Sequence, residues 1–450
     1  MKKFPIVCTL FLLFSLPAKT QQDEQALHAF NKYYHKSIEK LRELYGMRGA
    51  MFICDAEDEN KNYLSEVKDF ISRYGDLSQM IGVLFYSHEN DSLHTWLYHN
   101  DSLFYHVQHI TQKELSDNEY SLRASLQVTR LISKRAVINL RSEIIDEGPS
   151  TAVAKPLDSA IKESTDILFP ASIRTHLSSL SHLFIIPEYN IGQYPFHLLK
   201  PFNNNKYLVD KISFSFIPHL CNLGIFAQQY QFKLGEAQSL QAMHPLVVGN
   251  PAFSKNTAFR LLPLPGAESE AKAVANSLGT VALTGTAATV DTVAKLSKQS
   301  DLLYFATHGY FDFEKIMDGT FLAFAPGKNN SSGLWTSREI QNAQIKKQED
   351  AEPKMAILSA CQTGYGKVVP GGFIGLARAF YKSGVDFTIM SLWSVDDEKT
   401  KEFMLMYLEE LKKPNYFYPA FPLKKAIIRF KKENPNPVYW AAFSVFGFTF

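Results

Sequence analysis

The spacing of hydrophobic residues changes near residue 80. Before this point, apolar side chains recur every three or four residues, which predicts two helices, AFNKYYHKSIEKLRELYGM and NYLSEVKDFISRYG. Between residues 80 and 110, three short apolar runs are separated by the turn sequences HENDS and NDS, which predicts a meander of three strands. Helical spacing returns at roughly 113–145 and, after an EGPST break, at 155–180.

From residue 182 onward, continuous apolar runs alternate with helical patterns. The predicted strands are HLFIIPEY (182–189), KISFSFIP (211–218), PLVVGNP (245–251), TVALTG (280–285), LLYFATHG (302–309), MAILSACQTG (355–364) and VDFTIMSLWSV (385–395). Strands that are apolar on both faces and separated by helices are typical of a parallel sheet covered on both sides. The pattern therefore predicts an α/β fold with a mainly parallel sheet.

Two of the apolar runs end in reactive side chains, His308 and Cys361. Sites in open α/β sheets form beyond the carboxyl ends of the strands, and a thiol nucleophile needs a base, usually histidine. Gly309 follows the histidine, and the backbone N–H groups of Gly309 and Cys361 are candidates for an oxyanion hole. Alone, each residue has an ordinary structural explanation. Their separation of 53 positions, however, matches the caspase-type arrangement, which favours a catalytic pair.

The strand that follows ends in the acidic sequence WSVDD, which contains Asp396 and Asp397. Two interpretations remain open here. The carboxylates cap the next helix, or one of them lies at the floor of a substrate pocket and selects a Lys or Arg side chain. In PLPGAESE (263–270), the interpretation we favour for Glu268 is also helix capping.

Composition excludes several classes of function. The formal net charge is +2 with no long run of one sign, so the sequence predicts no nucleic-acid partner. There is no CxxC pair and no HExxH motif, and the glycine-rich VVPGGFIGLARAF lacks the lysine of a phosphate-binding loop. We therefore expect no metal and no other cofactor.

The N-terminus has the pattern of a secretory signal peptide. Lys2 and Lys3 precede the apolar FPIVCTLFLLFSL, and a polar QQDEQ follows. The apolar run is shorter than the roughly 20 residues that a membrane span requires. We expect cleavage near residues 18–21, export to the periplasm or the extracellular space, and no membrane span in the mature chain.

Three cysteines remain after such cleavage: Cys54, Cys221 and Cys361. In an oxidising compartment an odd number leaves at least one thiol unpaired. The sequence does not settle whether Cys54 pairs with Cys221. If it does, Cys361 is the free thiol that the catalytic interpretation requires.

Several motifs, in the same order, resemble the CHAT domain, a caspase-like domain often attached to tetratricopeptide repeats and related to separases and caspases. They are LFIIPEYNIGQYPFHLL, YLVDKISFSFIP, LPLPGAESEA, ATHGYFD, LSACQTG, GGFIGLARAFYKSGVDFTIMSLWSVDD and NPNPVYWAAFSVFG. The resemblance covers roughly residues 80–450. Tetratricopeptide repeats themselves are not evident in this sequence.

The resemblance implies a caspase-like α/β/α sandwich with His308 as base and Cys361 as nucleophile. SLWSVDD is similar to the separase segment whose acid binds the arginine before the cleaved bond, which implies that role for Asp397, with Asp396 as second choice. The implied organisation is a signal peptide (1–20), an N-terminal helical segment (21–78), an accessory, pseudo-caspase-like half (79–240) and a catalytic half (241–450).

The sequence therefore predicts a cysteine endopeptidase that acts on a protein or peptide substrate and cleaves after a basic residue. Because its usual sensor module is missing, we also expect activation by a protein partner. The alternative is a catalytically silent CHAT-type binding or signalling module. A glutamine-amidotransferase-like enzyme is a weaker alternative, because SACQT lacks the first glycine of a GxCxG elbow.

Overall fold

The structure is a computed structural model of the chain. It describes residues 24–36, 63–126, 138–139, 154–217, 234–240, 244–255, 259–312, 315, 317–346, 353–360, 367–369, 372–393 and 395–449. The predicted signal peptide and the three cysteines of the mature chain lie outside the described residues.

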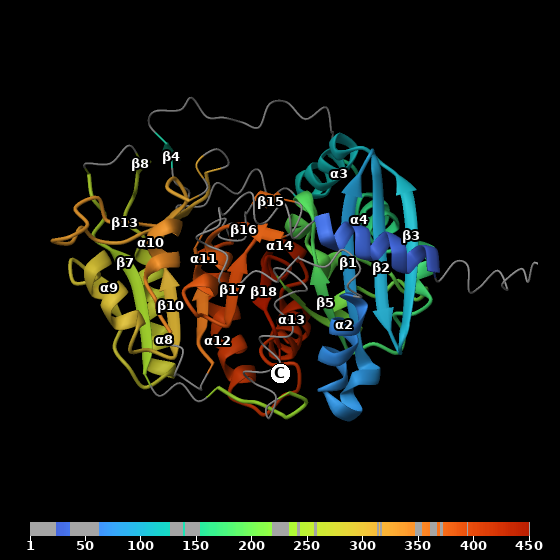
Figure 1. The fold of residues 1–450 in the computed structure, drawn as a ribbon. Helices are drawn as coiled ribbons and strands as arrows, with labels where there is room; N and C mark the ends of the chain where they lie inside the picture. Colours follow the sequence, from blue (N-terminus) through green and yellow to red (C-terminus); the bar gives the residue numbers. More distant parts are fainter. Residues whose placement is uncertain are drawn as a thin grey trace, which may run out of the picture.

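One sheet of eleven strands runs through the molecule (Figure 1). Across the sheet, the strands are β3 (Ser102–His109), β2 (Ser92–His99), β1 (Ile81–Glu89), β5 (His182–Ile186), β6 (Ser213–Phe216), β18 (Phe443–Gly447), β17 (Phe387–Ser391), β14 (Met355–Leu358), β10 (Leu302–Ala306), β7 (Pro245–Pro251) and β9 (Leu283–Gly285). Strands β1, β5 and β6 are parallel, and so are β17, β14, β10, β7 and β9. The predicted fold class, α/β with a mainly parallel sheet, is confirmed.

Helices cover both faces of the predicted catalytic half. One face carries α8 (Pro265–Ser277), α12 (Asp397–Leu411) and α13 (Ala420–Glu433), and the other carries α9 (Val290–Ser297), α10 (Ser337–Asn342) and α11 (Leu376–Lys382). Leu302 and Tyr304 of β10 belong to the core on the α8 side, whereas Leu303 and Phe305 belong to the core on the α9 side. This alternation is the two-residue period of a strand that is buried on both faces.

The accessory half contains the predicted meander of β1, β2 and β3 and several helices. These are a helix at residues 24–36, α2 (Tyr63–Ser72), α3 (Gln112–Ser125), α4 (Leu157–Leu168), α5 (Ala171–Arg174) and α6 (Leu208–Lys211), with 3-10 helices η2 (Gly75–Met80), η4 (Tyr189–Gln193) and η5 (Phe196–Leu198). The helix at 24–36 packs on the meander through Phe30, whose ring meets those of Phe85 and Trp96 edge to face.

Smaller pieces complete the fold, and some of them correct the sequence predictions. A three-stranded sheet contains β11 (Gly309–Tyr310), β12 (Phe321–Ala323) and β13 (Leu334–Thr336); β15 (Lys367–Val369) pairs with β16 (Gly372–Ile374), and α14 (Pro437–Trp440) precedes β18. The helix predicted at 113–145 is wrong at its distal part, because β4 (Ile138–Asn139) pairs there with β8 (Phe259–Arg260). The helix predicted at 155–180 is interrupted at Pro170, which cannot donate a backbone hydrogen bond and separates α4 from α5.

The C-terminal strand β18 joins the two predicted halves. It lies between β6 of the accessory half and β17 of the catalytic half, so both halves share one sheet. His197 Nε2 donates to Phe443 O (2.9 Å), and Thr449 Oγ1 lies 3.0 Å from His182 Nε2. Within the described ranges, no helix combines the length and the apolar character needed to cross a membrane.

Candidate active site

His308 follows the carboxyl end of β10, the strand that lies between β7 and β14. Residues 302–309 are all buried, so the apolar strand fixes where the histidine leaves the sheet. The small sheet beside it holds the backbone: Thr307 Oγ1 donates to Ala323 O, and Ala323 N donates to His308 O (2.9 Å). The side chain therefore leaves the sheet at a fixed point.

The ring of His308 is fully buried and is oriented by a backbone carbonyl. Its Nε2 lies 2.8 Å from Leu262 O. Because a carbonyl oxygen only accepts hydrogen bonds, Nε2 carries the proton, and Nδ1 is the unprotonated nitrogen of the neutral imidazole. The ring of Phe253 packs against the imidazole, with centroids 4.7 Å apart. The arrangement thus selects the tautomer in which Nδ1 can act as a base.

The segment that carries Leu262 is itself anchored to β7 and α8. Leu264 N donates to Asn250 Oδ1 (2.7 Å), and Asn250 Nδ2 donates to Glu268 Oε2 (2.9 Å). Lys272 Nζ also contacts Glu268 (2.6 Å) and, with Asn250, lowers the pKa of this carboxyl. Glu268, predicted as a capping residue, makes no side-chain cap to α8; it orients Asn250 instead. Sequence reasoning missed Leu262 because its contribution is a backbone carbonyl, which every residue has and no motif can identify.

Strand β14 ends at Leu358, three residues before Cys361. It pairs in parallel with β10, with Leu302 opposite Met355 and Phe305 opposite Leu358. Each pair differs by 53 positions, the same separation as His308 and Cys361. Cys361 itself lies outside the described residues.

The last described residue before Cys361 is held from the neighbouring strand. Ser391, at the end of β17, donates its hydroxyl to Ala360 O (2.7 Å), and both residues are buried. Sequence reasoning missed Ser391. The only sign of Ser391 in the sequence is a polar residue toward the end of an apolar run, a feature that many strands share.

Gly309 pairs with Leu322 in the antiparallel ladder of β11 and β12. The bond from Ala323 N to His308 O makes His308 and Ala323 the hydrogen-bonded pair next to it. Because the two kinds of pair alternate in an antiparallel ladder, Gly309 and Leu322 form a non-hydrogen-bonded pair. The N–H of Gly309 therefore points away from β12.

The two acids of WSVDD have different surroundings. Asp396 is exposed and is the N-cap of α12; its carboxylate accepts from Glu398 N and Lys399 N (3.1 Å each). Asp397 is half-buried and lies against Gly266 in the first turn of α8, where an added Cβ would stand 2.0 Å from its Oδ2. Asp397 thus lies against a residue that is four positions after Leu262, and Asp396 has the capping role.

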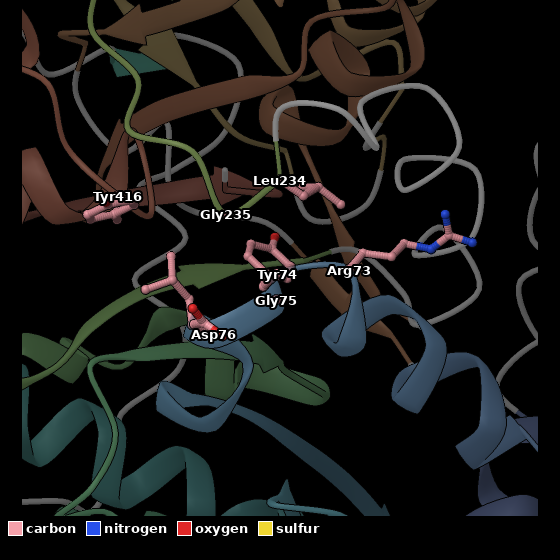
Figure 2. A pocket seen from close by; sticks show the side chains of 8 residues that line it. Arg73, Tyr74, Gly75, Asp76, Leu234, Gly235 and Tyr416 are labelled. Atoms are coloured by element: carbon pink, nitrogen blue, oxygen red, sulfur yellow. The ribbon is translucent and has the colours of Figure 1, made fainter.

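A surface cavity of about 350 Å³ lies beside the short turn that follows α2 (Figure 2). Its lining includes Arg73, Tyr74, Leu234, Gly235 and Tyr416. Strand β1 begins a few residues after Tyr74. Neither Phe253 nor Leu262, which contact His308, belongs to its lining. In the described part of the chain, no group of three or more His, Cys, Asp or Glu residues is arranged to hold a metal ion.

The sequence profile of the CHAT domain matches residues 158–448. Tetratricopeptide repeat protein 28 from Homo sapiens is 25% identical over 295 residues, which cover 59% of this chain and 12% of the relative. The mouse protein of the same name, from Mus musculus, is 24% identical over 292 residues, with the same coverage. This chain therefore corresponds to about an eighth of the length of these relatives.

Two solved structures are similar at low sequence identity. The separase–securin complex of Saccharomyces cerevisiae has a TM-score of 0.49 and 12% identity, covering 86% of this chain and 31% of that chain. The complex of Porphyromonas gingivalis RgpB pro- and mature domains has a TM-score of 0.37 and 10% identity, covering 75% of this chain and 77% of that chain.

Proposed function

The chain belongs to the CHAT domain family, and on this premise we propose that it is a cysteine endopeptidase. The Cys361 thiol transfers its proton to Nδ1 of His308, and the sulfur forms a bond to the peptide carbonyl carbon. The carbon–nitrogen bond then breaks as the proton passes to the leaving amine. Water, deprotonated by His308, hydrolyses the thioester and restores the thiol.

The observation that carries the proposal is the tautomer of His308. The hydrogen bond from Nε2 to Leu262 O reserves Nδ1 as the proton acceptor. The register of β10 with β14 supports the partnership, since continuing it by three residues pairs position 308 with position 361. Parallel neighbours end at the same edge of a sheet, so the proposal places both reactive groups at one edge.

The outward N–H of Gly309 supports its proposed role in the oxyanion hole, together with the N–H of Cys361. For substrate selection we propose Asp397, since Asp396 already caps α12. A carboxylate at this position favours a Lys or Arg side chain before the cleaved bond. Export of the mature enzyme, expected from the N-terminal sequence, is part of the same proposal.

The burial of His308 indicates that the enzyme needs activation, and it is also compatible with a second candidate function. A ring with no exposed surface cannot reach a leaving amine without some rearrangement. We therefore propose that a protein partner activates the enzyme by opening this region. The alternative is a catalytically silent CHAT module that binds partners and cleaves nothing.

Cleavage of peptide libraries tests the proposal. We expect the wild-type chain to cleave Lys- and Arg-containing peptides, and Cys361→Ala to lose roughly a thousandfold or more of this activity. Cys221→Ala is the matched control, because it removes a thiol that the mechanism does not use. Equal cleavage by wild type and Cys361→Ala would exclude the mechanism. Preference for an acidic residue before the cleaved bond would exclude only the role of Asp397.

A further inference from the structure

Arg123 of α3 is buried where three elements meet. Its side chain is 6% exposed and pairs with Glu119, one turn earlier on the same helix and 10% exposed. Its Nη2 donates to Gln193 O (2.7 Å) at the end of η4, and its Nη1 donates to Leu392 O (3.0 Å) just beyond β17. One guanidinium therefore links α3, η4 and the end of β17.

The two carbonyl acceptors and Glu119 together require a guanidinium rather than an ammonium group at this position. Burying a charge is costly unless it is paired and its hydrogen-bonding groups are satisfied, and Glu119 supplies the opposite charge. The planar guanidinium presents several fixed donors, whereas an ammonium is a compact point charge that cannot match the same acceptors. Because both carbonyls belong to the backbone, the contact fixes two chain segments.

The fixed segment of the catalytic half is part of the candidate active site. Leu392 directly follows Ser391, whose hydroxyl holds Ala360 next to Cys361. In the other direction, the chain passes Trp393, whose ring lies 5.9 Å from the guanidinium of Arg123, and reaches Asp397 four residues later. The contact from Arg123 therefore lies between Ser391, which holds Ala360 next to Cys361, and Asp397.

We propose that Arg123 is a positioning residue through which the accessory half sets the geometry of residues 391–393 and 395–397. This inference rests on the proposed peptidase function. It assigns inhibition to a defined point, distinct from activation at the His308 region: a partner that displaces α3 breaks the bonds to Gln193 and Leu392, releases the segment that ends at Asp397 and lowers activity.

The test uses the full chain with two Arg123 variants. Arg123→Lys keeps the positive charge but loses the planar set of N–H donors that reaches both carbonyl oxygens. The double variant Arg123→Met with Glu119→Leu removes both buried charges at similar volume, which is often tolerated, so the fold is retained while the bonds to both carbonyls are lost. Lys113→Met with Asp117→Leu is the matched control, an exposed pair of the same spacing on the same helix.

We expect hydrogen exchange of residues 391–397 to become about tenfold faster in both Arg123 variants, and kcat/KM for Arg-containing peptides to fall about tenfold, mainly through KM. The control should match the wild type in both. Unchanged exchange would overturn the inference, and so would faster exchange with an unchanged kcat/KM. If the wild type cleaves nothing, the proposed function fails, and exchange alone decides whether Arg123 fixes the segment.

Discussion

At the scale of single residues, the tautomer of His308 and the position of the Asp397 carboxylate depend on backbone that the sequence motifs do not identify. Leu262 O sets the tautomer of the histidine. Gly266 leaves the space that the carboxylate of Asp397 occupies. The motifs predict which side chains form the site, but not what orients them. The carbonyl of Leu262 is anchored through Asn250 and Glu268, which belong to other elements.

Asp397 and Asp396 can be separated by substitution. We expect Asp397→Asn to lower kcat/KM for Arg-containing peptides about tenfold, because the charge that pairs with the substrate is lost. Gly266→Ala should have a similar effect, since the new Cβ displaces the carboxylate without removing it. The measurement is kcat/KM for Arg- and Leu-containing peptides.

Asp396→Ala is the control for this pair. It removes an N-cap and should cost about 1 kcal/mol of unfolding free energy while leaving peptide selectivity unchanged. Loss of Arg selectivity in Asp396→Ala, with none in Asp397→Asn, would reverse the assignment.

At the scale of elements, prediction succeeded where one local pattern suffices. The apolar run PLVVGNP and strand β7 coincide at Pro245–Pro251. Prediction failed at β18, which was not predicted as a strand. The sequence FSVFG is short, and its place between β6 and β17 depends on contacts with residues far away in the chain.

At the scale of the molecule, contacts between distant parts of the chain join the two predicted halves. Strand β18 and Arg123 both cross the predicted boundary. Such long-range contacts follow from tertiary packing, which no local pattern records. The same junction buries two histidines, His182 and His197.

Acid should weaken this junction. Burial, with a smaller effect of Lys424, lowers the pKa of His182 to about 3, and burial lowers that of His197 to about 3. The unfolded chain binds these protons near pH 6.5, so stability is complete above that pH and falls as the pH drops toward 3. At pH 5 each histidine accounts for about 2 kcal/mol of the loss.

Denaturant unfolding at pH 7 and pH 5 measures this effect. His182→Gln should lower stability at pH 7, yet lose about 2 kcal/mol less than the wild type between the two pH values. The same difference between pH 7 and pH 5 in both proteins would contradict the role of His182.

The central claim is that His308 activates Cys361. The most direct measurement is the site of labelling by an arginine-containing peptide with a thiol-reactive group, mapped by mass spectrometry in wild type and His308→Gln. We predict an adduct on Cys361 that forms at least about tenfold more slowly in the variant. An adduct on Cys54 or Cys221 alone, or equal rates at Cys361 in both proteins, would contradict the claim.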